Sequence, residues 1–159
     1  YSDIIFGDQN EWEIASGVPH IPFEALDADY EIDKEAYLEY FRKMHQLFPK
    51  CKKMVMAVRN QIASSHHTLS GLLYDAVEDQ LYTTRIYDIE PIVDPMGVGD
   101  AFIAAYIHAH QKWGDKNQYC LDFSLSASAI KNTVPGDQNL VTEEEIINNM
   151  TSSGGRIQR

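Results

Sequence analysis

Two glycines and an aspartate near the middle of the chain have the residue types and the spacing of a phosphate-transfer site. They lie in the segment Asp94-Pro95-Met96-Gly97-Val98-Gly99-Asp100-Ala101-Phe102, between a strand-like run that ends at Val93 and an apolar helical run from Ala101 to Ala109. A glycine turn at a helix start exposes backbone N–H groups that have no partner inside the helix. These donors and the positive end of the helix dipole favour an anion such as a phosphate. An aspartate beside them can take the proton of a hydroxyl that attacks the phosphorus.

The same pattern has a purely structural interpretation, because a strand–Gly-x-Gly–helix turn also occurs where a chain simply bends. The segment is not a Walker motif, since no Gly-Lys-Ser/Thr follows the first glycine. It also lacks the third glycine of the Gly-x-Gly-x-x-Gly turn that dinucleotide-binding folds use. From the residues alone, an anion site and a plain turn both stay open.

The composition argues against several classes of function. The 159 residues suffice for one domain, and a net charge of −11 argues against binding to a nucleic-acid backbone. We expect no membrane partner, because no apolar run approaches the ~20 residues that a spanning helix needs, and there is no signal-peptide pattern. Cys51 and Cys120 have no metal-binding spacing, so we expect reduced thiols and a cytoplasmic protein. Because the first residue is Tyr1, we expect the natural N-terminus to be missing.

Apolar periodicity predicts alternating helices and strands, which is typical of an α/β layered sheet. The expected strands are Asp3–Phe6, Met54–Val58, Ser70–Ala76 and Gln80–Ile86. The expected helices are Asp8–Ala15, Lys34–Phe48, Asp100–Trp113 and Tyr119–Asn132, with a last helix capped at Thr142 and a loose tail over Ser152–Arg159.

Three other groups of residues could do chemistry, and each has an alternative explanation. Asp8 and Glu11 lie one turn apart at a helix start, where they form either a capping pair or part of a metal site. Arg59 follows a buried strand and either holds an anion at the sheet edge or is simply solvated. His66 and His67 are adjacent on a strand and point to opposite faces, which disfavours a shared metal.

Taken in order, these segments resemble the C-terminal half of the ribokinase-family (PfkB) carbohydrate kinases. The segment 94–102 is similar to the family signature Asp-Thr-x-Gly-Ala-Gly-Asp-Ala-Phe, and 3–11 is similar to the strand and Asn-x-x-Glu that precede it. Within the family, segments 57–59, 63–66 and 130–142 resemble the 2-keto-3-deoxygluconate kinases. The resemblance implies a ribokinase-like layered parallel sheet flanked by helices, with residues 1–159 forming only its C-terminal, nucleotide-binding and catalytic part. Family members are about twice as long.

The resemblance also implies roles for individual residues. Asp100 matches the catalytic base that contacts the substrate, and Gly97, Val98 and Gly99 match the anion hole. Glu11 matches the residue that organises Mg²⁺ through water, and Asp8 stands at the metal side where the family usually has Asn.

Four further positions are carried over from the same resemblance. Arg59 and Asn60 match a loop under the nucleotide phosphates, and Ser126 lies near the adenine-side helix. Asp137 falls where the keto-deoxygluconate enzymes contact the sugar acid. Asp94 matches a residue that helps hold a monovalent cation such as K⁺ in some members.

The resemblance therefore implies an ATP- and Mg²⁺-dependent sugar kinase whose small-molecule acceptor is a sugar acid, 2-keto-3-deoxygluconate. It implies that the complete protein is a homo-oligomer. The Arg59 and Asp137 positions favour the sugar acid over a ribokinase- or fructokinase-like acceptor. A truncated, non-catalytic nucleotide-binding module is the remaining alternative, and we expect the 159-residue chain by itself to be inactive as a kinase.

Overall fold

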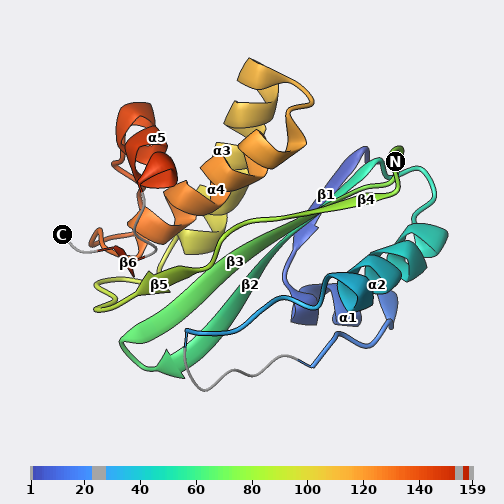
Figure 1. The fold of residues 1–159 in the computed structure, drawn as a ribbon, viewed down its shortest axis with the longest axis horizontal. Helices are drawn as coiled ribbons and strands as arrows, with labels where there is room; N and C mark the ends of the chain where they lie inside the picture. The colour runs from blue at the N-terminus through green and yellow to red at the C-terminus, as the bar shows by residue number, and fades with distance from the viewer. Residues whose placement is uncertain (1, 23–27, 153–155, 158–159) are drawn as a thin grey trace.

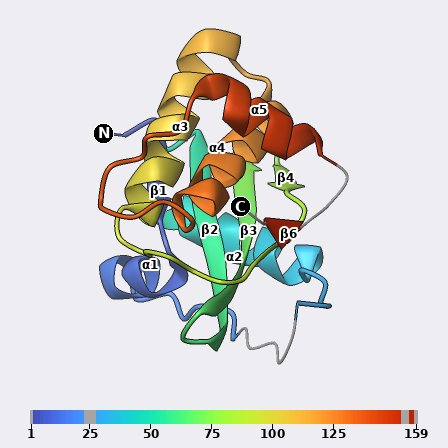
Figure 2. The ribbon, with the colours of Figure 1, turned by 90° about the vertical axis from the view of Figure 1, so that its left-hand side faces the viewer.

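The computed structural model describes residues 2–22, 28–152 and 156–157, which form one sheet covered by helices on both faces (Figure 1). The strands are β1 (Ile4–Gly7), β2 (Lys53–Ala63), β3 (His66–Asp75), β4 (Gln80–Thr83), β5 (Tyr87–Ile89) and β6 (Arg156–Ile157). The helices are α1 (Gln9–Ser16), α2 (Lys34–Leu47), α3 (Val98–Trp113), α4 (Asn117–Lys131) and α5 (Glu143–Thr151). Figure 2 shows α3, α4 and α5 on one side of the sheet and α1 and α2 on the other. The predicted α/β class is confirmed.

The sheet is mixed, whereas the resemblance to the kinase family implied a parallel one. Its order is β1-β2-β3-β5-β6, with β4 also paired to β3. The β1–β2 and β5–β6 pairs are parallel, but β3 runs antiparallel to β2, β4 and β5. The reason is local: only Ser64 and Ser65 separate β2 from β3, and so short a connection permits only an antiparallel hairpin. This hairpin extends β2 well beyond the expected Met54–Val58.

Alternation along β2 divides the core into two layers. Met54, Met56 and Val58 pack with the aromatic side chains of α1 and α2. Val55 points to the opposite face and packs among the apolar residues of α3 and α4. A strand buried on both faces reads as a continuous apolar run, which is why this strand was visible in the sequence.

Serine hydroxyls of α4 fix the helices around it. Ser124 Oγ donates to the carbonyl of Phe102 at 2.6 Å, and Ser128 Oγ donates to the carbonyl of Val98 at 3.0 Å. Both serines are buried, so each bond satisfies a hydroxyl that would otherwise be costly to bury. The small residues of α4 thus permit close packing, as predicted, and also set the position of α3.

Several predicted boundaries differ from the structure. The strand expected to end at Val93 stops at Ile89, and residues 90–97 are irregular. The α3 helix begins at Val98, so Val98, Gly99 and Asp100 form its first turn. Part of the expected tail forms β6 beside β5, while residues 153–155 and 158–159 lie outside the described residues. None of the described helices combines the length and the apolarity that a membrane crossing requires.

Candidate functional site

The carboxyl end of β1 and the middle of β2 form the floor of the candidate site. These strands are parallel and Gly7 pairs with Met56, so Asp8, which follows β1, and Ala57, which continues β2, lie beside each other at the edge where β1 ends. Two hollows of about 290 and 260 Å³ open there and share both residues in their walls. Open α/β sheets bind their ligands at such an edge.

The smaller hollow brings together residues that are almost ninety positions apart in the sequence. Asp8 and Glu11 line it from the start of α1, and Gly99 and Asp100 line it from the first turn of α3. The predicted catalytic aspartate and the predicted metal-side carboxylates therefore face one cavity. The larger hollow continues from Asp8 to Arg59.

The turn before α3 exposes backbone donors. Gly97 precedes the helix with a φ of 71°, a left-handed conformation that glycine adopts without steric cost, and no side chain caps this end. The first intrahelical bond runs from Ala101 N to the Gly97 carbonyl at 2.9 Å. The N–H groups of Val98, Gly99 and Asp100 thus have no acceptor within the helix. This is the arrangement that an anion hole needs.

Asp94 forms hydrogen bonds both within this turn and to a second loop. Its Oδ1 accepts from Met96 N at 2.9 Å and its Oδ2 accepts from Gly136 N at 2.8 Å. These two backbone donors lower the pKa of the Asp94 carboxyl, with a smaller contribution from the positive charge of Lys131. The carboxylate therefore holds the predicted sugar-side loop, residues 135–137, against the phosphate turn.

The two predicted metal-side carboxylates cap α1. Asp8 Oδ1 accepts from Glu11 N at 2.8 Å, and Glu11 Oε2 accepts from Asp8 N at 2.9 Å. The capping interpretation is thereby confirmed, and it is compatible with a metal role because both side chains are exposed and carry further oxygen lone pairs. Gly7 is required before them, since a Cβ there would lie 2.0 Å from the indole nitrogen of Trp12.

Over the described ranges, no three His, Cys, Asp or Glu side chains gather into a group that could hold a metal ion. His66 instead pairs with Asp88 at 2.5 Å. His67 is buried, and burial, together with the charge of Arg59, lowers the pKa of its imidazole. Any metal at the candidate site would thus depend on water or substrate oxygens for most of its ligands.

The predicted nucleotide residues fall in different surroundings. Arg59 is exposed and lines the larger hollow. Asn60 is buried and pairs with Thr68 in the β2–β3 ladder, so the expected phosphate loop is in fact continuous strand. Ser126 is fully buried: its hydroxyl donates to the carbonyl of Ile146 at 2.8 Å and accepts from Asn149. Its side chain fixes α5 against α4 and does not reach solvent.

A groove of about 290 Å³ between α3, α4 and α5 was missed in the sequence. Alanine and other mainly apolar side chains line it: Ala101, Ala104, Ala105, His108, Phe123, Ala127, Asn139, Val141, Glu143 and Ile146. The signal was the spacing of small residues on one face of α3, at 101, 104 and 105. Their partners on α5 could not be identified without the tertiary structure.

Ion pairs hold α5 at the rim of this groove. Lys112 Nζ donates to both oxygens of Glu143, at 2.6 and 2.8 Å, and His108 Nε2 lies 2.7 Å from the same carboxylate. These interactions lower the pKa of the Glu143 carboxyl. An exposed ionic contact between α3 and α5 thus lies at the rim of the groove.

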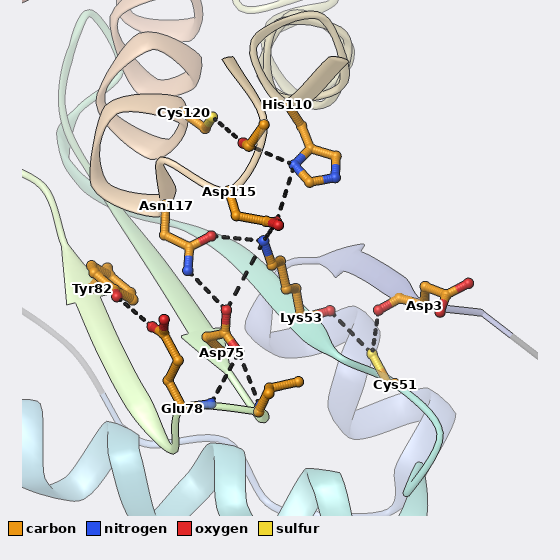
Figure 3. Close-up of polar contacts among 12 residues, drawn as sticks. Asp3, Cys51, Lys53, Asp75, Glu78, Tyr82, His110, Asp115, Asn117 and Cys120 are labelled. Carbon is orange, nitrogen blue, oxygen red and sulfur yellow. Dashed lines mark hydrogen bonds and ion pairs between the residues drawn. The ribbon is translucent and has the colours of Figure 1, made fainter. Parts of the chain in front are cut away.

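A second polar cluster lies at the other end of β2 (Figure 3). Lys53 Nζ donates to Asp115 Oδ1 at 2.5 Å and to Asn117 Oδ1 at 2.8 Å. Asn117 Nδ2 donates in turn to Asp75 Oδ2 at 2.8 Å, and Asp75 Oδ1 accepts from Val77 N. The cluster joins β2, β3 and α4 at the start of β2, and none of its residues lines either hollow of the candidate site.

No protein-family model matches the chain, and no curated protein matches it either. Solved structures do match. The chain is similar to the 2-dehydro-3-deoxygluconokinase of Thermotoga maritima, with 25% identity and a TM-score of 0.79 over 94% of this chain and 41% of that one. It is also similar to a PfkB family carbohydrate kinase from Listeria grayi, with 28% identity and a TM-score of 0.66 over 81% of this chain and 40% of that one.

The fold is also shared with the ribokinase of Arabidopsis thaliana, solved with ribose and ATP, at 20% identity and a TM-score of 0.68 over 95% of this chain and 41% of that one. The chain thus spans about two fifths of the length of these structures. The predicted resemblance to ribokinase-family carbohydrate kinases is confirmed by these structural neighbours, and the fold is part of a ribokinase-like kinase fold.

Proposed function

We propose that residues 1–159 form the nucleotide-binding and catalytic part of an ATP-dependent sugar kinase. The observation that supports this most directly is the shared hollow in which Gly99 and Asp100 face Asp8 and Glu11. The structural neighbours are sugar kinases, and one of them was solved with ribose and ATP.

In the proposed reaction, the acceptor hydroxyl loses its proton to the Asp100 carboxylate while its oxygen attacks the γ-phosphorus of ATP. The bond between the γ-phosphorus and the β–γ bridging oxygen breaks, and ADP leaves. The N–H groups of Val98, Gly99 and Asp100 bind the oxygens of the transferred group, where negative charge is concentrated. Because the donors are fixed by the turn, little reorganisation is needed during the transfer.

Oxygen ligands suit Mg²⁺, and the exposed Asp8 and Glu11 carboxylates fit a site in which the ion keeps several waters. When bound, Mg²⁺ neutralises charge on the nucleotide phosphates. The capping bonds restrict the rotamers of both side chains, and both residues line the hollow. An aspartate at position 8 also brings a negative charge that the family's usual Asn lacks.

We assign the nucleoside to the groove between α3, α4 and α5. It begins at Ala101, one residue after the proposed base, and follows α3 away from the phosphate turn to His108. Its small, mainly apolar lining suits a flat aromatic base, and the buried Ser126 supports the α5 wall.

For the acceptor we propose a sugar acid of the 2-keto-3-deoxygluconate type. Arg59 offers an exposed positive charge beside Asp8, and Asp137 is packed against the phosphate turn. A coupled kinase assay on a complete protein containing these residues, with 2-keto-3-deoxygluconate, ribose and fructose, tests this. We expect the highest kcat/KM for the sugar acid. A preference for ribose or fructose would exclude the sugar-acid assignment but leave the kinase proposal intact.

A nucleotide-binding module without activity is the second candidate for the 159 residues taken alone, because they span only about two fifths of the neighbouring kinases. We expect calorimetry to show weak binding of Mg²⁺-ATP and a coupled assay on the same sample to show no sugar phosphorylation. Without a held acceptor, lost positioning alone removes several kcal/mol of rate acceleration. Phosphorylation by a preparation whose intact mass equals these residues would contradict the expectation.

A further inference from the structure

A lysine with no exposed surface lies at the end of α4. Lys131 has a relative exposure of 0%, and its Nζ donates to the carbonyl of Val134 at 3.1 Å. Burying an ammonium is costly unless a compensating charge or dipole is close by. None of the roles assigned above uses this group.

The surroundings of Lys131 place it directly behind the phosphate turn. The carbonyl of the next residue, Asn132, accepts from Val93 N at 2.8 Å and from Asp94 N at 3.2 Å. One turn earlier, Ser128 bonds to the carbonyl of Val98. The last turn of α4 is thus joined to both ends of the segment that carries the proposed anion hole.

Lys131 and the loops around it also affect whether Asp94 could hold the expected monovalent cation. Both oxygens of this carboxylate already accept a backbone N–H, one from Met96 and one from Gly136. The charge of Lys131 also acts on Asp94, which contributes to the lowered pKa of that carboxyl. A second cation at Asp94 would be repelled by the ammonium of Lys131, which is itself fully buried. The two hydrogen bonds leave oxygen lone pairs free, so it is the charge of Lys131 that makes this site unfavourable for an added K⁺.

We propose that the Lys131 ammonium takes the place of a monovalent cation and acts as a fixed positive charge behind the Gly97–Gly99 turn. This rests on the proposed kinase function. Lys131 is a positioning residue: it acts through Asp94 and the loop carbonyls and does not touch the substrate. A built-in charge of this kind makes phosphate binding independent of K⁺.

A purely structural role must be distinguished from this one, because a cation at a helix C-terminus also stabilises the helix dipole. That role predicts lower stability on substitution but no response of nucleotide binding to K⁺. The test therefore measures the binding of a non-hydrolysable Mg²⁺-ATP analogue in potassium chloride and in tetramethylammonium chloride at equal ionic strength.

We expect the native chain to bind the analogue with the same affinity in both salts. The Lys131→Met variant, which is neutral and similar in volume, should bind at least ~10-fold more weakly. The Lys131→Ala variant, which leaves space, should recover affinity in potassium chloride but not in tetramethylammonium chloride. Lys43→Met, an exposed lysine on α2, is the matched control and should behave as the native chain.

Tighter binding by the native chain in potassium chloride overturns the proposal, and so does native affinity in Lys131→Met. If the Lys131 variants do not fold, the salt comparison on the native chain still decides. If the native chain binds no nucleotide in either salt, the kinase proposal fails. Thermal unfolding then tests Lys131 by itself, since a native Tm that potassium raises above its value in tetramethylammonium overturns the inference, and equal values support it.

Discussion

The backbone of Gly97 lies against Asp137 so closely that a Cβ on the glycine would be 2.2 Å from the Asp137 carbonyl oxygen and 2.7 Å from its Oδ1. The phosphate turn and the proposed sugar-side loop are therefore in direct contact, without room for even one methyl group. Gly97 is needed for two separate reasons, its left-handed φ of 71° and this contact.

A series of three alanine substitutions separates these reasons. Gly17 has the same left-handed conformation, with a φ of 72°, but a Cβ there would meet nothing within 4 Å, and Gly99 has neither constraint. We expect Gly17→Ala to cost about 1–2 kcal/mol of stability, Gly97→Ala to cost more, and Gly99→Ala to cost nothing. Urea unfolding of the three variants measures this order. Equal losses for Gly97→Ala and Gly17→Ala would show that the contact with Asp137 is unimportant.

Replacing the proposed base, Asp100, should lower the turnover rate but preserve the binding of ATP. In a complete protein containing these residues, we expect Asp100→Asn to lower kcat by at least ~10²-fold, because the amide cannot accept the hydroxyl proton. Binding of Mg²⁺-ATP should persist, since the backbone donors of the turn are unchanged. Glu144→Gln, an exposed carboxylate at the start of α5, is the control. Turnover near the native rate in Asp100→Asn would remove this residue from the role of base.

The β3–β4 turn should lose stability in acid. Asp79 accepts from Arg42 Nε at 2.9 Å and from Tyr74 Oη at 2.9 Å, and these bonds lower the pKa of its carboxyl to about 2. Its folded-state pKa thus lies below the usual 3.8, so its stabilising contribution is complete above that value and is lost as the pH falls toward 2.

We test this with Asp79→Asn, which removes the charge but tolerates the positive φ of 52° at this position. The difference in the free energy of unfolding between the native chain and this variant should shrink as the pH falls through the acid range. Glu39→Gln, an exposed position on α2, should show no such change. A difference that stays constant with pH would rule out the ion pair as its source.

Adjacent lysines at the start of β2 should differ greatly in their importance. Lys53 is buried near the buried Asp75, with 4.0 Å between Nζ and Oδ2, whereas Lys52 and its partner Asp3 are largely exposed. Lys53→Met leaves a buried carboxylate without its cation and should cost about 3–5 kcal/mol. Lys52→Met should cost much less than Lys53→Met, because an exposed ion pair is screened by water. Chemical denaturation checks both, and a small loss for Lys53→Met would mean that Asn117 alone can satisfy Asp75.

The sequence was sufficient where local chemistry decides the structure. The capping box of Asp8 and Glu11 and the glycine turn before α3 both depend on residues within a few positions of each other, and both were predicted. The buried run of β2 was visible because a strand covered on both faces is continuously apolar.

The features that could not be predicted from the sequence depend on contacts between residues far apart in the chain. Ser126 looks the same in a sequence whether it faces a ligand or, as found here, the carbonyl of Ile146. Asn60 was expected in a loop because the family resemblance implied one there, and nothing local shows that the β2–β3 hairpin extends past Arg59. The groove along α3 has a wall from α5, which begins more than thirty residues after Ala105. Such contacts arise only when separate elements pack together.

The two bonds of Asp94 have a mechanical consequence. The Asp94 carboxylate accepts from Met96 N with one oxygen and from Gly136 N with the other, so it cross-links two loops. Neither loop can shift alone without breaking a hydrogen bond of Asp94. We therefore expect the two loops to move together. A ligand that displaces residues 135–137 must carry the Gly97–Gly99 turn with it. Strain applied on the acceptor side is thus transmitted directly to the donors that would hold the phosphoryl group.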